Sequence, residues 1–175
     1  LKYDEAKNET ESEQVSIILN HDKVLTFQEK ESDDFESIRE RIRKKKGKLH
    51  RSGPDFLCYS IIDFIIDNYF IVLEKIGDRI DILEEEVLGD TEEQTIQKLH
   101  SLKRDTLAIR KSLWPIRDIL GFMLKPDNTI ITDSTRLFLR DAYDHTVEAI
   151  ETVEVYRDFI SGLLDINLSR MSNRM

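Results

Sequence analysis

The sequence is poor in the residues that break helices or cross-link chains. It has one cysteine, Cys58, three prolines and six glycines among 175 residues. A single cysteine excludes an internal disulfide framework and fits a reducing compartment. Few prolines and glycines leave few forced turns, so long helices are expected. We find no signal-peptide pattern and no run of about 18 consecutive apolar residues, so we expect no bilayer-spanning segment in this chain.

Motifs of catalysis are also missing. There is no glycine-rich phosphate loop, no cysteine pair and no nucleophile motif, and the four histidines are scattered. The sequence therefore predicts a protein that is not an enzyme.

The formal net charge is −9 and 35% of residues are charged, above the ~25% of an ordinary domain. This balance argues against nucleic acid as a partner and permits cations.

The first third of the chain predicts the end of an α/β domain. Residues 1–13 are polar and expected to be irregular, whereas 14–19 and 23–29 are β-branched and apolar and predict a hairpin. An isolated hairpin is marginally stable in water. Either the hairpin leans on the helices that follow, or it belongs to a sheet with further strands upstream of Leu1. We favour the second alternative.

A short helix is predicted over 34–46, with Gly47 as its end, because its acids lie at the start and its bases at the end. The bases continue, so residues 39–51 hold eight lysines and arginines. A phosphate-binding patch is one interpretation. A solvated helix end is the favoured one, since no aromatic side chains interleave to stack on bases.

Residues 54–124 predict two long antiparallel helices. Pro54 suits a first helical turn, Gly89 and Asp90 end the first helix, and the run 91–94 (TEEQ) is a capping box for the second. In both helices apolar positions recur in steps of three and four. These predicted core positions are Ile62, Ile66, Tyr69, Leu73, Ile76, Ile80, Leu83 and Val87, then Leu99, Leu102, Thr106, Ile109, Leu113, Ile116, Leu120 and Met123.

The last predicted helix, 134–175, carries acids at the heptad positions that are normally apolar in a helix seam. It would be ~60 Å long, so its far end should project from the body. A solvent-facing side is the favoured interpretation, with Tyr143, Ile150, Val153, Ile160 and Leu164 packing elsewhere. Against it, lysine is absent from 141–172, although solvated faces usually pair Lys with Glu. The alternative is a polar, cation-attracting channel lined by several copies. The stripe consists of Asp141, Asp144, Glu148, Glu151, Val155, Asp158, Gly162, Asp165, Ser169 and Ser172.

One cluster in this helix has the spacing of metal ligands. Asp141, Asp144, His145 and Glu148 share one side of the helix. Di-metal sites in helical bundles need matching Glu or His on facing helices. The predicted seams of the other two helices are apolar apart from a threonine and a tyrosine hydroxyl, so an internal di-metal site is not expected.

Five stretches together resemble the CorA family of magnesium transporters, collinearly from about Glu13 to Met175. They are IRERIR, YSIIDFIIDNYFIVLEKI, DILEEEVL, LKRDTLAIRKSLWPIRDIL and RDAYDHTVEAIETVEVYRDFISGLLDINLSRMSNRM. The Gly-Met-Asn signature of the family follows its first transmembrane helix and is not in this sequence. The ends of the chain also suggest a fragment of a longer protein.

The resemblance implies an α+β, mostly α fold. Residues 1–53 would be the end of a cytoplasmic α/β domain, 54–124 a long-helix hairpin, and 134–175 a stalk leading into a membrane span. It further implies a homopentamer at the cytoplasmic face of the cell membrane, with no nucleic acid partner. The function implied is the regulatory region of a channel for Mg²⁺, with Co²⁺ or Ni²⁺ as possible substitutes, that senses intracellular Mg²⁺ at subunit interfaces.

Site residues follow from the same resemblance. Asp141 would hold the regulatory metal together with acids of a neighbouring subunit that precede Leu1. Asp63 matches a position linked to a second metal, although an acid stabilised only by its place near the helix start is an equal alternative. Asp165, Leu168 and Ser172 would line the pore. Two other functions stay open: a zinc-transporting relative of the same superfamily, and a soluble helical scaffold that oligomerises.

Overall fold

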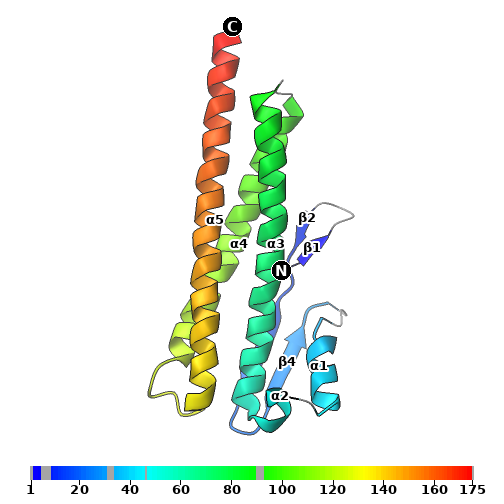
Figure 1. Ribbon diagram of the computed structural model, residues 1–175, viewed down its shortest axis with the longest axis vertical. Coiled ribbons are helices and arrows are strands. Elements are labelled where there is room, and N and C mark those ends of the chain that lie inside the picture. Colours follow the sequence, from blue (N-terminus) through cyan, green and yellow to red (C-terminus); the bar gives the residue numbers. More distant parts are fainter. Residues whose placement is uncertain (1, 5–8, 31–33, 46, 90–92, 175) are drawn as a thin grey trace.

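Three long helices form the body of the protein. The computed structural model describes residues 2–4, 9–30, 34–45, 47–89 and 93–174. The long helices are α3 (Pro54–Leu88), α4 (Glu93–Met123) and α5 (Asp133–Arg174). α3 and α5 run in the same direction, and α4 runs the opposite way and crosses obliquely behind them (Figure 1). Two small antiparallel sheets complete an α+β fold that is mostly helical.

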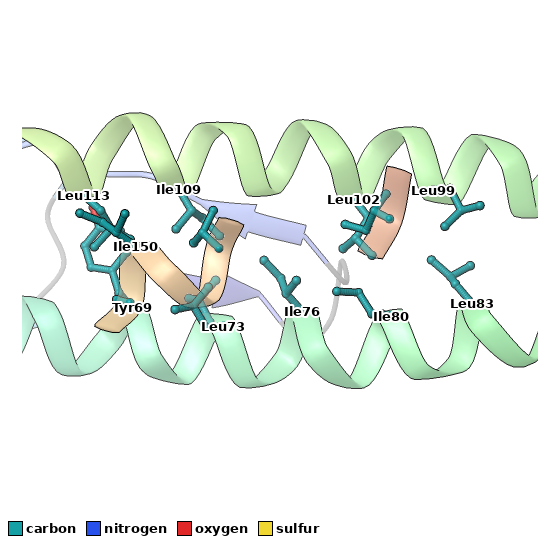
Figure 2. Close-up of a cluster of buried hydrophobic side chains, with 14 of the residues drawn as sticks. Tyr69, Leu73, Ile76, Ile80, Leu83, Leu99, Leu102, Ile109, Leu113 and Ile150 are labelled. Carbon is teal, nitrogen blue, oxygen red and sulfur yellow. The ribbon is translucent and has the colours of Figure 1, made fainter. Parts of the chain in front are cut away.

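The core between α3 and α4 is the one that the apolar spacing predicts. Of the sixteen predicted positions, fifteen are buried, and Ile116 is half-buried. Figure 2 shows Leu73, Ile76, Ile80 and Leu83 of α3 pointing toward Leu99, Leu102, Ile109 and Leu113 of α4. Burial of one such side chain contributes roughly 1.5–3 kcal/mol. Asp90 of the predicted helix end, and Thr91 and Glu92 of the predicted capping box, lie outside the described residues.

α5 packs against this pair with one side only. Its buried residues recur at helical spacing: Thr135, Leu139, Ala142, Thr146, Ala149, Ile150, Val153, Ile160, Leu163 and Asn167. Of the residues predicted to pack, Ile150, Val153 and Ile160 are buried, and Tyr143 and Leu164 are half-buried. The two parallel helices approach closely at Gly77, where an added Cβ would lie 2.8 Å from the Tyr156 hydroxyl. As predicted, the end of α5 projects beyond the tip of the α3–α4 hairpin (Figure 1).

The N-terminal strands agree with the sequence in part. The predicted hairpin is present as β3 (Val15–Leu19) and β4 (Val24–Gln28), paired with Ile17 opposite Thr26. The prediction that residues 1–13 are irregular is wrong, because β1 (Lys2–Asp4) and β2 (Glu9–Glu11) pair in antiparallel fashion. Pairing of this kind uses backbone hydrogen bonds, so it can form without the apolar alternation that sequence reasoning requires.

The predicted helix over 34–46 is shorter and is followed by a second one. α1 (Glu36–Arg43) starts two residues late, and α2 (Lys48–Arg51) was not predicted. Lys45 ends α1 early because its φ of 51° lies in the left-handed region, which a lysine gives no reason to expect. Gly47, with φ 76°, then starts α2. Arg39 and Arg43 of α1 pair with Glu36, and Lys44, directly after the helix, pairs with Glu40.

The β3–β4 hairpin leans on α3 with one face and leaves the other exposed. Its outer face presents Ile18, Leu25 and Phe27, each about half exposed. Between the hairpin, α3 and the second half of α4 lies a groove of about 890 Å³, lined by apolar residues such as Ile62 and Met123. The first alternative for the hairpin is therefore realised. Pairing with strands upstream of Leu1 stays a prediction, as does the division into domains.

α3 is more hydrophobic than a count of consecutive apolar residues indicates. It contains an 18-residue window of mean hydropathy 1.7 with at most two charged residues, so by length and composition it could cross a membrane. A search for consecutive apolar residues does not detect this window, because isolated acids interrupt the apolar run without changing its average. The expectation that no segment of this chain spans a bilayer stays a prediction. Half of the window is buried inside the protein. Core helices pass the same test, and α3 packs against α4 and α5 along most of its length.

A buried carboxylate joins the starts of α3 and α5. Asp55 is 3% exposed, and its Oδ2 accepts hydrogen bonds from the Thr132 amide (2.9 Å) and hydroxyl (2.6 Å). Burial by itself would raise the pKa of Asp55, but the hydrogen bonds from Thr132, Thr135 and Phe56 outweigh it and hold the pKa below its ordinary value. Asp55 therefore fixes the lower end of α5 beside the lower end of α3.

We predict that Asp55→Asn lowers the free energy of unfolding by about 1–3 kcal/mol at pH 7, because charge-assisted hydrogen bonds are lost. A carboxyl with a lowered folded-state pKa stabilises above its unfolded pKa, ~3.9, and loses this effect as pH falls through the folded value. Urea unfolding at pH 7 and pH 3 should show the difference from wild type shrinking at pH 3. Asp127→Asn, in an exposed loop, is the control. An equal difference at both pH values would contradict the assignment.

Candidate functional site

The acidic stripe of α5 lies on the side that faces away from α3 and α4. All ten of its residues, from Asp141 to Ser172, are exposed, and Val155 is 65% exposed although it is apolar. The buried side of α5 is apolar or small, so packing leaves the helix only one orientation. The favoured solvent-facing interpretation is confirmed for the single chain, and six of the ten residues of the stripe are acids.

A second group of acids lies on α3 at the same level of the molecule. Asp63 is half-buried, and its Oδ2 accepts a hydrogen bond of 3.0 Å from the Tyr59 hydroxyl. Asp67 follows one turn later and is exposed. Across the helix pair, the His145 ring of α5 lies edge-on to Phe70 of α3, with centroids 6.2 Å apart.

These groups act on one another electrostatically. Burial is the largest effect on Asp63 and raises its pKa, and the negative charges of Asp67 and Asp141 raise the pKa further. The hydrogen bond from Tyr59 and the nearby His145 lower the pKa of Asp63 in part. Burial and the same acids also raise the pKa of Tyr59. The two residues predicted to bind metal, Asp63 and Asp141, thus belong to one electrostatic cluster, which we call the α3–α5 acid cluster (Asp63, Asp67, Asp141 and His145).

The donor set of this cluster suits a hard cation but is incomplete. Carboxylate oxygens are the ligands that Mg²⁺ takes in proteins, and Mg²⁺ keeps several of its waters. Across the described ranges, no group of three or more His, Cys, Asp or Glu residues is arranged to hold a metal ion. The expectation of no internal di-metal site stays a prediction. The residues fit a Mg²⁺ ion bound by one or two carboxylates and further ligands from elsewhere.

The other predicted residues lie far from the acid cluster. Asp165, Leu168 and Ser172 are exposed near the end of α5. Asp165 follows Asp141 by 24 positions, which in a helix is ~36 Å. The charges of Asp141 and Asp63 act on each other, and both residues are separated from the three residues assigned to a pore.

Sequence reasoning missed several residues of the site. Tyr59 and Asp67 lie at i−4 and i+4 of Asp63, so their spacing places them on one helix side. Neither residue belongs to the apolar stripe or to the metal positions that the resemblance implies. The anchoring role of Asp55 had no local signal, because its partner Thr132 is 77 residues away.

We predict that Tyr59→Phe raises the pKa of Asp63, since the hydroxyl hydrogen bond favours the ionised carboxylate. Titration of the Asp63 carboxyl by NMR measures this directly. Tyr156→Phe, which alters a tyrosine elsewhere on the α3–α5 interface, should leave the Asp63 titration unchanged. A fall in the pKa of Asp63 in Tyr59→Phe would contradict the hydrogen-bond assignment.

Comparison with known proteins places this geometry in a family. The family described as "CorA-like Mg2+ transporter protein" matches residues 1–175. The chain is 48% identical over 172 residues to the cobalt/magnesium transport protein CorA of Thermotoga maritima, covering 98% of this chain and 49% of that protein. It thus spans about half the length of that relative.

Solved structures show the same fold. The CorA magnesium transporter of Methanocaldococcus jannaschii superposes with a TM-score of 0.76 at 22% identity, over 93% of this chain and 56% of that one. The ZntB cytoplasmic domain of Vibrio parahaemolyticus gives a TM-score of 0.77 at 16% identity, over 92% of this chain and 62% of that one. The match along its whole length and the identity to a cobalt/magnesium transport protein show that the chain belongs to the CorA-like Mg²⁺ transporter family.

Proposed function

We propose that this chain is the regulatory region of a homopentameric divalent-cation channel at the cytoplasmic face of the cell membrane. In this proposal Mg²⁺, or Co²⁺ in its place, binds at Asp141, with Asp63 nearby, between neighbouring subunits and closes the pore. The whole protein transports Mg²⁺. The observation that carries the proposal is the outward-facing, lysine-free acidic stripe of α5 beside an acid cluster with too few ligands.

The incomplete ligand set supports a site shared between copies. Asp141 is exposed and can reach a neighbouring molecule, whereas Asp63 is held back by its Tyr59 hydrogen bond. Two facing carboxylates about 5 Å apart repel by roughly 3 kcal/mol at an effective dielectric of 20. A bound cation removes this repulsion. Repeated at each interface, such an energy is large enough to select between a closed and an open assembly.

The distal residues support a separate role in conduction. Asp165, Leu168 and Ser172 lie on the exposed part of α5 at or near its projecting end. If copies of α5 surround an axis with the acidic stripe inward, these residues line the path, and the ring of Asp165 carboxylates concentrates cations at its mouth.

Two other functions are less well supported. The fold is shared with a ZntB domain and so does not by itself separate Mg²⁺ from Zn²⁺, but the 48% identity is to a cobalt/magnesium transport protein. A soluble scaffold would use its exposed stripe for oligomerisation. A stripe of acids without lysines opposes such assembly unless a cation neutralises it.

We predict that Mg²⁺ promotes association of this chain and that Asp141→Ala abolishes the effect. Sedimentation velocity with and without millimolar Mg²⁺ measures it, because a Mg²⁺ ion that keeps several waters at an exposed carboxylate is bound weakly. Asp118→Ala removes an exposed acid on α4 that pairs with Arg117 and serves as the control. Mg²⁺-dependent association that survives in Asp141→Ala would count against a sensor at this residue.

In the parent transporter, sensing and conduction should separate. We predict that Asp141→Ala needs about tenfold more internal Mg²⁺ for shut-off, equivalent to ~1.4 kcal/mol of lost binding, with unchanged maximal flux. Asp165→Asn should lower flux and keep the shut-off concentration. Flux assays in reconstituted vesicles of varied internal Mg²⁺ measure both. Identical behaviour of the two variants would contradict the division of roles.

A further inference from the structure

The tip of the α3–α4 hairpin contacts α5 through polar groups. A guanidinium nitrogen of Arg170 donates a hydrogen bond to the backbone carbonyl of Val87, in the last turn of α3. One turn earlier on α5, Asn167 is 2% exposed and continues the buried side of that helix beyond Ile160 and Leu163. These contacts lie at the opposite end of the bundle from Asp55 and the α3–α5 acid cluster.

The last turn of α3 is poorly stabilised by its own sequence. The final carbonyls of a helix lack partners within it, and its C-terminal end favours cations. α3 has no basic residue in its last turn and instead carries Glu84, Glu85 and Glu86 there. The cations come from other helices: Lys98 of α4 donates to Glu86 at 2.8 Å, and Arg170 of α5 caps Val87. These cations supplement the backbone hydrogen bond from the Gly89 amide to the Glu85 carbonyl, which closes the last turn within α3 itself.

Asn167 weakens the same contact. Its side-chain Oδ1 is buried and has no hydrogen-bond partner within the described part of the chain. A buried polar atom without a partner costs free energy, whereas an apolar side chain of similar shape would not. A polar residue at one seam position also favours a single register between helices. The contact between this part of α5 and the end of α3 thus favours one register of the two helices but is weakly packed.

We propose that Asn167 and Arg170 form a releasable latch that holds the hairpin tip on α5 and keeps the last turn of α3 helical. Arg170 acts as a positioning residue. It lies between Leu168 and Ser172 in the sequence, so release of the latch would free the part of α5 assigned above to the pore. That last consequence rests on the proposed function. The latch itself requires no metal.

Hydrogen exchange of this chain, measured by NMR without divalent cations, tests the latch. In Arg170→Ala we expect about tenfold faster exchange for the amides of residues 85–89 and no change for 62–69, since only the cap of α3 is lost. Arg170→Lys, which keeps the charge and one donor, should restore most of the protection. Asn167→Leu should change exchange in the opposite direction, slowing it at residues 85–89, and raise the melting temperature by about 3–8 °C.

The control is Arg140→Ala, which removes an exposed arginine from the same helix and should leave exchange at residues 85–89 as in wild type. Unchanged exchange at 85–89 in Arg170→Ala, or equal acceleration along the whole of α3, would overturn the latch. Faster exchange at residues 85–89 in Asn167→Leu would show that Asn167 does not weaken the contact, and would overturn the idea that the latch is releasable. Because these measurements contain no Mg²⁺, their failure is distinguishable from failure of metal sensing, which the Asp141→Ala association experiment reports.

Discussion

Packing of one side of α5 against α3 and α4 is the interaction on which the rest of the structure depends. The buried side of α5 consists of residues such as Leu139, Val153 and Ile160, each almost fully buried. Turning the helix about its axis would expose these side chains and bury carboxylates, which costs several kcal/mol for each unpaired charge. The acidic stripe must therefore face outward, and any function of the stripe takes place on the surface of the single chain.

The two ends of this packed unit are held by different chemistry. At the lower end, Asp55 is almost fully buried and accepts hydrogen bonds from Thr132. These bonds join the start of α3 to the start of α5. At the upper end, Arg170 reaches a backbone carbonyl, and Asn167 lies in the seam without satisfying its oxygen. The helices are thus joined more firmly at the Asp55 end of the bundle than at the Arg170 end. The α3–α5 acid cluster lies near the Asp55 end, and the proposed latch lies at the other end.

The acid cluster shows why the proposed metal site needs a neighbouring molecule. Asp63 is raised in pKa by burial and by Asp67 and Asp141, so the negative charges on one chain already oppose one another. They do not supply enough ligands for a metal within the described residues. A second molecule that adds oxygen ligands would bind more tightly with a cation at the contact. Cation binding would then favour association of the chains rather than folding of the single chain.

The sequence by itself determined the helices and their apolar sides. The three- and four-residue spacing from Ile62 to Met123 identified a core in which fifteen of sixteen positions are buried, because helical periodicity is a local property. The motifs also indicated the family and drew attention to Asp63 and Asp141. Only the tertiary structure decided that these two acids share one cluster with His145, that Thr132 binds Asp55, and that Arg170 caps α3. Such contacts join residues far apart in the chain, and no local pattern encodes them. The strands of residues 1–13 and the early end of α1 at Lys45 escaped prediction because backbone pairing and a left-handed lysine leave no signature in side-chain pattern.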